Sequence, residues 1–193
     1  GHLVEADRSS LVAGYCGQTA LKTKDVVDSA LGGVLFVDEA YTLVSDDGKD
    51  TFGREALDTL IKLVEDHRSD LVVVLAGYSL EMATLLATNP GLHSRFPTVI
   101  EFEDYTVDEL LEIADHMLVQ DVMVLSQDAG ERLRGVFQAL TERGVVSRVD
   151  GNGRAVRNIL ERAKRRQAVR LQSAANCASQ EELCTLLSED FDE

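Results

Sequence analysis

No apolar run in this sequence of 193 residues approaches the roughly 20 residues that a membrane-spanning helix needs. Its first residues, 1–5, lack the charged and apolar regions of a secretory signal peptide. Low-complexity tracts and internal repeats are also missing. These absences predict a soluble, cytoplasmic, globular protein.

Cysteine and positive charge are both scarce. Cys16, Cys177 and Cys184 stand in no metal-ligand spacing, and neither CxxC nor HExxH occurs. The 19 Lys and Arg residues face 34 Asp and Glu, which gives a net charge of -15. Because nucleic-acid backbones are bound by Lys and Arg that neutralise phosphates, we expect no nucleic-acid partner.

The first half of the sequence alternates between strand and helix patterns. Apolar runs of strand length at 3–6, 34–37 and 71–76 are separated by segments with helical periodicity at 20–31 and 56–64. This alternation predicts a parallel sheet with crossover helices, and the run 34–37 is typical of a strand covered on both faces. A last short strand is predicted at 99–102.

The sequence after residue 104 has only helix patterns. Thr106 with Glu109, and Ser179 with Glu182, have the spacing of capping boxes that open helices. Further helices are predicted from Ser126 and over 154–171, and the last helix carries Leu183, Leu186 and Leu187. We therefore predict an α/β part over 1–104 and a small all-helical part over 105–193.

Two adjacent carboxylates follow the apolar run 34–37. Ligand sites of open α/β sheets lie beyond the carboxyl ends of the strands, which is where Asp38 and Glu39 are expected. Asp38 suits Mg²⁺ held through water, and Glu39 suits polarisation of a water for attack on a γ-phosphate. An ordinary solvated acidic turn after a buried strand has about equal weight on this short pattern alone.

Three further segments contain candidate functional residues. Tyr15-Cys16-Gly17 offers an aromatic, a small apolar residue and a glycine on a loop, although a lone Tyr packing on its own domain is the more common arrangement. Arg95 is placed in a loop before the strand at 99–102, and its local alternative is a surface pair with Glu101 or Asp104.

The third segment contains two arginines at the start of a predicted helix. Arg154 and Arg157 lie three apart on one face and are able to bring positive charge to a phosphate. The later basic residues have the spacing of a solvated face; they are Arg162, Lys164, Arg165, Arg166 and Arg170.

In order and spacing, these signals resemble the AAA+ ATPases, and specifically the CbxX/CfqX group. That group includes the red-type Rubisco activase, the stage V sporulation protein K type and the EccA ATPases of type VII secretion. The resemblance covers residues 1 to about 171 and is closest at 1–8, 32–41, 75–78 and 151–154. It implies a partial three-layer αβα domain with a parallel sheet, followed by a helical lid.

The resemblance also implies roles for single residues. Asp38 and Glu39 match the Walker B pair, with Asp38 on Mg²⁺ through water and Glu39 on the attacking water. Arg95 matches an arginine finger that acts on the adjacent subunit. The match further assigns Tyr15, Cys16 and Gly17 to a pore loop that grips a polypeptide, Tyr78 to the sensor 1 position, and Arg154, with Arg157 beside it, to sensor 2 in the lid.

One element of the family pattern is missing, since GxxxxGK[ST] occurs nowhere in these residues. Its backbone amides and Lys would hold the phosphates. We therefore expect a fragment of a longer ATPase that uses ATP and Mg²⁺ in a hexameric ring to remodel a protein. The alternatives are a non-hydrolysing ring partner that lends Arg95 to an intact paralogue, and a non-functional remnant.

Overall fold

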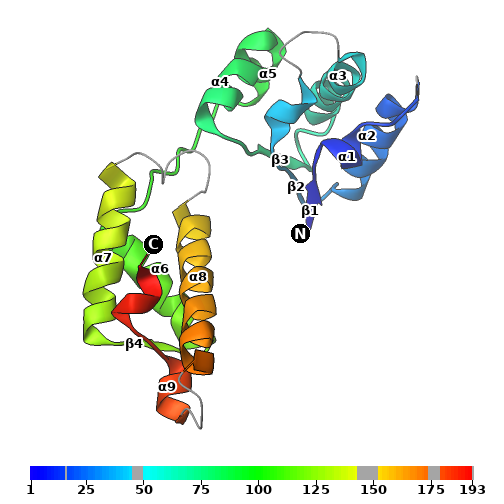
Figure 1. Ribbon diagram of the computed structural model, residues 1–193. Coiled ribbons are helices and arrows are strands. Elements are labelled where there is room, and N and C mark those ends of the chain that lie inside the picture. The colour runs from blue at the N-terminus through cyan, green and yellow to red at the C-terminus, as the bar shows by residue number, and fades with distance from the viewer. Residues whose placement is uncertain (16, 45–49, 143–151, 174–178, 193) are drawn as a thin grey trace. The chain divides into compact units, whose positions relative to one another are not determined.

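The computed structural model describes residues 1–15, 17–44, 50–142, 152–173 and 179–192. The chain forms two compact units, Gly1–Glu101 and Phe102–Glu193, and each is described by itself (Figure 1). Within the described ranges, no helix combines the length and the apolar character that crossing a membrane requires.

The first unit is built on a parallel sheet of three strands, β1 (Leu3–Ala6), β2 (Val34–Val37) and β3 (Val72–Leu75), in the order β1-β2-β3. Ala6 pairs with Val37, and Val37 pairs with Leu75. The three strands therefore end at one edge of the sheet. The predicted strands are confirmed, with β3 one residue shorter at each end than the apolar run.

Helices connect these strands or follow the last of them. They are α1 (Arg8–Leu11), α2 (Thr19–Ser29), η1 (Ala40–Leu43), α3 (Thr51–Asp66), α4 (Ser79–Thr88) and α5 (Pro90–Arg95). Three of them begin where an Asx side chain accepts a hydrogen bond from a backbone N–H of the first turn: Asp7 caps α1, Asp50 caps α3 and Asn89 caps α5.

The core of this unit lies on one face of the sheet. Leu35 and Val37 are fully buried in one cluster with residues of the surrounding helices, whereas Val34 and Phe36, which alternate with them, are only half-buried. On β3, Val72 and Val74 are exposed. The prediction that β2 is covered on both faces is therefore met on one face only among the described residues.

The strand predicted at 99–102 is wrong. This segment has no regular structure, and Val99, Ile100 and Phe102 are all exposed. The sheet of this unit consists of β1, β2 and β3 among the described residues, so the segment has no ladder partner there. High β propensity forms a strand only where another strand supplies hydrogen bonds.

The second unit packs three long helices around its own core. These are α6 (Val107–Gln120), α7 (Gln127–Glu142) and α8 (Asn152–Ser173). Leu118, Phe137 and Leu160 are among the residues buried between them. Both predicted capping boxes are present, at Thr106 and Ser179.

The predicted helical lid is confirmed, with one pair of two-residue strands that was not predicted. After α9 (Gln180–Cys184) the chain forms β5 (Thr185–Leu186), which pairs in parallel with β4 (Val124–Leu125), and then the short helix η2 (Ser188–Phe191). Leu186 is fully buried as a strand residue and not on a helix. A short apolar run such as Leu186-Leu187 fits either structure by periodicity alone.

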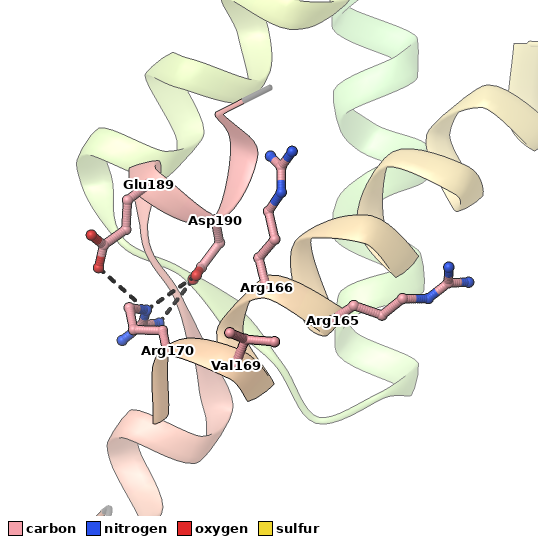
Figure 2. A pocket seen from close by; sticks show the side chains of 6 residues that line it. All are labelled: Arg165, Arg166, Val169, Arg170, Glu189 and Asp190. Carbon is pink, nitrogen blue, oxygen red and sulfur yellow. Dashed lines mark hydrogen bonds and ion pairs between the residues drawn. The ribbon is translucent and has the colours of Figure 1, made fainter. Parts of the chain in front are cut away.

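Two side chains of α8 hold this C-terminal segment. The Gln167 amide nitrogen is shared among the backbone carbonyls of Glu182, Leu183 and Thr185, at 2.9–3.2 Å. One turn further, Arg170 donates from Nε and Nη2 to the two oxygens of Asp190, at 3.1 and 2.8 Å (Figure 2). The pair with Asp190 raises the pKa of Arg170.

Candidate functional site

The carboxyl edge of the sheet brings together the residues that follow each strand. The Asp38 N–H donates to the Ala6 carbonyl at 2.8 Å, and the Ala40 N–H donates to the Ala76 carbonyl at 3.0 Å. The turn after β2 is thus fixed to both neighbouring strands by its backbone. Its two carboxylates, Asp38 and Glu39, remain exposed at this edge, where ligands of α/β sheets bind.

Glu39 has a left-handed backbone conformation, with φ 46° and ψ 44°. This region is uncommon for residues other than Gly, Asn and Asp, and it costs about 1–3 kcal/mol. Two hydrogen bonds of the Glu39 backbone accompany it: its N–H donates to the Asp38 side-chain Oδ1 at 2.9 Å, and its carbonyl accepts from the Thr42 N–H at 2.8 Å. At this residue the chain turns sharply from β2 into η1.

Two tyrosines lie beside this turn. The rings of Tyr41, on η1, and Tyr78, the N-cap of α4 three residues after β3, have centroids 6.1 Å apart and planes tilted by 43°. Burial raises the pKa of Tyr41, and the charge of Glu39 together with a hydrogen bond to it raises that pKa further. Tyr78 therefore lies near the sheet edge that holds Asp38 and Glu39, where its ring contacts Tyr41.

Arg8 supports the same turn from the other side. Its Nη1 donates to the Thr42 carbonyl at 2.7 Å and lies 2.6 Å from Asp50 Oδ2. The hydrogen bond from Arg8 lowers the pKa of Asp50. One guanidinium thus ties α1, η1 and the N-terminus of α3 together.

Arg95 is the last residue of α5, not part of a loop as predicted. The start of this helix was signalled by Asn89-Pro90, a capping residue followed by Pro at the first helical position. The Arg95 Nη1 donates to the Gly91 carbonyl at 3.2 Å. Its Nε lies 3.4 Å from Glu65 Oε2, which is ion-pair distance, although this Nε makes no hydrogen bond.

The ion pair of Arg95 is with Glu65 of α3, and not with Glu101 or Asp104, which the local alternative to the arginine finger named. Among the described residues, no hydrogen bond or ion pair joins Arg95 to Asp38 or Glu39. His93 lies in the same last turn of α5.

The loop before α2 presents an aromatic tip. Tyr15 is 74% exposed, so it does not pack on its own unit. Gly17 has φ +79°, a conformation that strains any residue with a Cβ. The base of the loop is fixed, because the Thr19 hydroxyl accepts from the Ala13 N–H and the Thr23 hydroxyl donates to the Leu11 carbonyl. Cys16 lies outside the described residues.

Arg154 and Arg157 are both exposed in the first two turns of α8. Asn152, at the start of this helix, donates to Asp104 Oδ1 at 2.9 Å and accepts from the Tyr105 N–H at 3.1 Å. The start of α8 is thereby fixed to the start of α6 within the second unit. Neither arginine has an ion pair in the part of the chain that the structure describes.

Asp38 offers a single carboxylate, which suits Mg²⁺ in particular. The described residues contain no cluster of three His, Cys, Asp or Glu side chains able to hold an ion by themselves. Mg²⁺ does not need such a cluster, because it keeps several waters and takes one or two carboxylates together with substrate phosphates. Exposed Asp38 at the sheet edge fits that ligand set.

Two supporting residues, Tyr41 and Arg8, were not identified from the sequence. Their contacts join segments far apart along the chain, and no local pattern signals them. The only trace is that both lie inside the segments, 32–41 and 1–8, that match the family best.

Comparison with known proteins covers both units. Residues 1–104 match the family described as "ATPase family associated with various cellular activities (AAA)", and residues 106–193 match the AAA lid domain. Stage V sporulation protein K of Bacillus subtilis is 48% identical over 172 residues, which are 89% of this chain and 52% of that protein.

Two further relatives show the same relation. Protein CbbX of Cereibacter sphaeroides is 43% identical over 91% of this chain and 56% of its own length. ESX-1 secretion system protein EccA1 of Mycobacterium tuberculosis is 47% identical over 88% of this chain and 30% of its own length. The chain thus spans about half or less of the length of these relatives.

Among solved structures, the FIGL-1 AAA domain in complex with ADP matches with a TM-score of 0.65. The match covers 97% of this chain and 59% of that chain at 16% sequence identity. At this identity the match shows the fold alone, an AAA domain with a parallel sheet and a helical lid.

Proposed function

Because the chain belongs to the AAA family of ATPases, in the group of CbbX, stage V sporulation protein K and EccA1, we propose that it forms part of an ATP-hydrolysing site. Hydrolysis would drive the remodelling of a protein partner by a ring of subunits, a hexamer, in the cytoplasm. The observation that carries this proposal is the acidic pair at the carboxyl edge of the sheet, Asp38 and Glu39.

The two carboxylates have different roles in this proposal. Asp38 would hold Mg²⁺ through water, and the ion would neutralise charge on the phosphates. Glu39, which is exposed at the residue after Asp38, would orient and polarise the attacking water. Tyr78 at the adjacent strand end would contact the nucleotide from the sensor 1 position.

Arg95 would complete the site of a neighbouring subunit. Its present partner, Glu65, leaves the Arg95 side chain 29% exposed, and the buried Nε of Arg95 makes no hydrogen bond. Partly exposed pairs of this kind contribute about 0–1 kcal/mol, so releasing Arg95 to a γ-phosphate costs little. An arginine finger stabilises charge in the transition state and contributes about 10³–10⁵ in turnover.

The lid and the loop before α2 would bind phosphate and protein, respectively. Arg154 and Arg157 lack ion pairs among the described residues, so their charge is available to a phosphate. Tyr15 is an exposed ring on a loop with a fixed base, which suits a grip on a polypeptide, with Cys16 and Gly17 beside it. We propose this tripeptide as the pore loop of the ring.

The phosphate cradle is not among these residues, since GxxxxGK[ST] does not occur in them. The complete site therefore needs a cradle from other residues, of the same gene product or of another subunit. The second case is the alternative function: a ring partner that does not hydrolyse ATP and lends Arg95 to an intact paralogue.

The test is turnover and ATP affinity of the full gene product with Glu39→Gln. We expect hydrolysis to fall by about 10²–10⁴, the contribution of a positioned acid–base group, with ATP affinity unchanged. Glu101→Gln is the control, because it removes an exposed carboxylate away from the site. Unchanged turnover in Glu39→Gln would remove Glu39 from the mechanism. The alternative function would be established by a different result: the wild-type gene product has no turnover of its own, but it restores ATPase activity to a paralogue that lacks its arginine finger.

A further inference from the structure

We propose that Arg8 is a positioning residue for the reaction of Glu39: its guanidinium fixes the η1 turn, and that turn fixes the backbone of Glu39. This proposal rests on the proposed function, because it assigns a task to Arg8 within that site. It goes beyond the acidic pair, the finger and the lid arginines. Arg8 would act only through the backbone of the turn, and not as a catalytic residue.

The backbone of Glu39 needs support from other residues. Its left-handed conformation is uncommon for a residue with a long side chain, and such conformations persist only where the surrounding structure holds them. The Glu39 carbonyl accepts from the Thr42 N–H at 2.8 Å, so the place of Glu39 depends on where Thr42 is held. Misplacing a reacting group by about 1 Å can cost about 100-fold in rate.

Arg8 holds Thr42 by its carbonyl. The Arg8 Nη1 donates to this carbonyl at 2.7 Å, and the same nitrogen lies 2.6 Å from Asp50 Oδ2. Asp50 is itself fixed to α3, because its other oxygen, Oδ1, accepts from the Gly53 N–H at 3.0 Å. A continuous path of polar contacts therefore runs from the first turn of α3 to Glu39.

The fold leaves room for this guanidinium at one glycine. A Cβ on Gly53 would lie 2.7 Å from Arg8 Nη1 and 2.1 Å from the Leu43 carbonyl oxygen, closer than real Cβ contacts come. Gly53 is buried in the first turn of α3, although glycine is unfavourable within a helix. The missing side chain lets α3 and η1 approach the guanidinium together. Since the Arg8 side chain is 37% exposed, its contacts do not serve to fill the core.

The two carboxylates of the site depend on Arg8 to different degrees. Asp38 is fixed from the strand side, because its N–H donates to the Ala6 carbonyl at 2.8 Å. Glu39 is fixed from the η1 side, through Thr42. Loss of Arg8 should therefore disturb the residue that activates water and spare the residue that would hold Mg²⁺, so turnover should change without ATP affinity.

The kinetic test is Arg8→Met in the full gene product. We expect kcat to fall about 10-fold, a part of the loss that a displacement of about 1 Å causes, while the Kd for ATP stays unchanged. Arg8→Lys should recover most of this loss, because both contacts come from one nitrogen and an ammonium also donates more than one hydrogen bond. Wild-type kcat in Arg8→Met would overturn the proposal, and so would an Arg8→Lys variant as slow as Arg8→Met.

Lys22→Met is the matched control. Lys22 also holds α1 by backbone carbonyls, since its Nζ donates to Ser9 at 2.6 Å and to Val12 at 3.0 Å, and both partners lie outside the η1 turn. Its loss should loosen α1 against α2 while kcat stays at the wild-type value. If Lys22→Met lowers kcat as much as Arg8→Met does, the effect comes from α1 as a whole and the positioning role of Arg8 is wrong.

Amide hydrogen exchange tests the contact path without turnover. In ¹⁵N-labelled protein, Arg8→Met should speed exchange at Thr42, whose N–H donates to the Glu39 carbonyl. Exchange at Ala76, whose N–H donates to the Val37 carbonyl at 2.9 Å within the sheet, should stay the same.

Each outcome of the exchange experiment decides a separate point. Equal exchange at Thr42 in wild type and Arg8→Met would contradict the contact path. Faster exchange together with wild-type kcat would retain the path and overturn the positioning role alone. Faster exchange in a protein that has no ATPase activity before any substitution would overturn the positioning role together with the proposed function.

Discussion

Two pairs of polar residues, one in each unit, are held in opposite ways. In the lid, Gln167 and Asp190 are buried, at 6% and 2% exposed, and their partners are other parts of the same unit. In the α/β unit, Asp38 and Glu39 are exposed and are fixed by backbone contacts. Buried polar groups that are fully paired serve the fold, while exposed ones held by a rigid backbone remain free to meet a ligand.

This contrast separates charged residues that resemble one another in sequence. Arg154 and Arg170 belong to one basic run on one helix, yet Arg154 is exposed without an ion pair among the described residues, and Arg170 binds a buried carboxylate. The contrast therefore predicts which substitutions affect chemistry and which affect stability.

The largest effect is expected at Arg95. Arg95→Ala should lower turnover by about 10³–10⁵ in the full gene product, while the free energy of unfolding changes by no more than about 1 kcal/mol. Arg68→Ala is the control, because Arg68 also pairs with Glu65, at 3.3 Å, and is mostly exposed. ATPase assays and urea unfolding measure the two quantities. A loss of stability as large as the loss of turnover would mean that Arg95 serves the fold.

The next effect is on lid stability. Arg170→Ala leaves Asp190 buried without its cation, which should lower the free energy of unfolding by about 3 kcal/mol. Arg154→Ala, on the same helix, should change it by less than about 0.5 kcal/mol. Urea unfolding followed by circular dichroism compares the two. Equal losses would contradict the division between anchoring and functional arginines.

A smaller loss is expected at Gln167. Its amide serves three carbonyls, so Gln167→Ala should cost about 2 kcal/mol, because buried acceptors lose their donor. Gln172→Ala, exposed on the same helix, is the control and should be close to neutral. If the two variants unfold at the same urea concentration, the amide is not an anchor.

The smallest effect concerns the free energy of unfolding at acidic pH. Hydrogen bonds from Ser10 and Ser9 lower the pKa of Asp7 to about 2, below its ordinary value of 3.8. Its capping contribution is therefore complete above about pH 4 and is lost as the pH falls toward 2. Asp7→Asn still caps α1 but does not titrate, so its urea midpoint should depend less on pH over that range. Superimposable pH profiles would exclude Asp7 from the acid response.

Local patterns were sufficient to predict most of the elements. The apolar runs gave β1 to β3, and the pairs Thr106–Glu109 and Ser179–Glu182 located two helix starts. The segment 99–102 failed because strand formation depends on a partner, which no local pattern reveals. The pairing of β4 with β5 was not predicted for the same reason.

The site divides in the same way. The order of parallel strands predicts that Asp38 and Glu39 lie at the carboxyl edge, and the structure places them there. The contacts that hold this edge come from Arg8, Tyr41 and Tyr78, and the partner of Arg95 is Glu65. Each joins elements that meet only once the chain has folded, so sequence spacing carried no signal for them.

The most direct test of the central claim, that Arg95 of one subunit serves Glu39 of the next, is ATPase activity in mixed rings. A Glu39→Gln protein keeps its finger but does not hydrolyse, and an Arg95→Ala protein keeps Glu39 but receives no finger in its own ring. After confirmed subunit exchange, an equimolar mixture contains sites with both groups intact. We predict that the mixture regains activity that neither protein has alone. No recovery on mixing, or near-normal turnover by Arg95→Ala alone, would contradict the account.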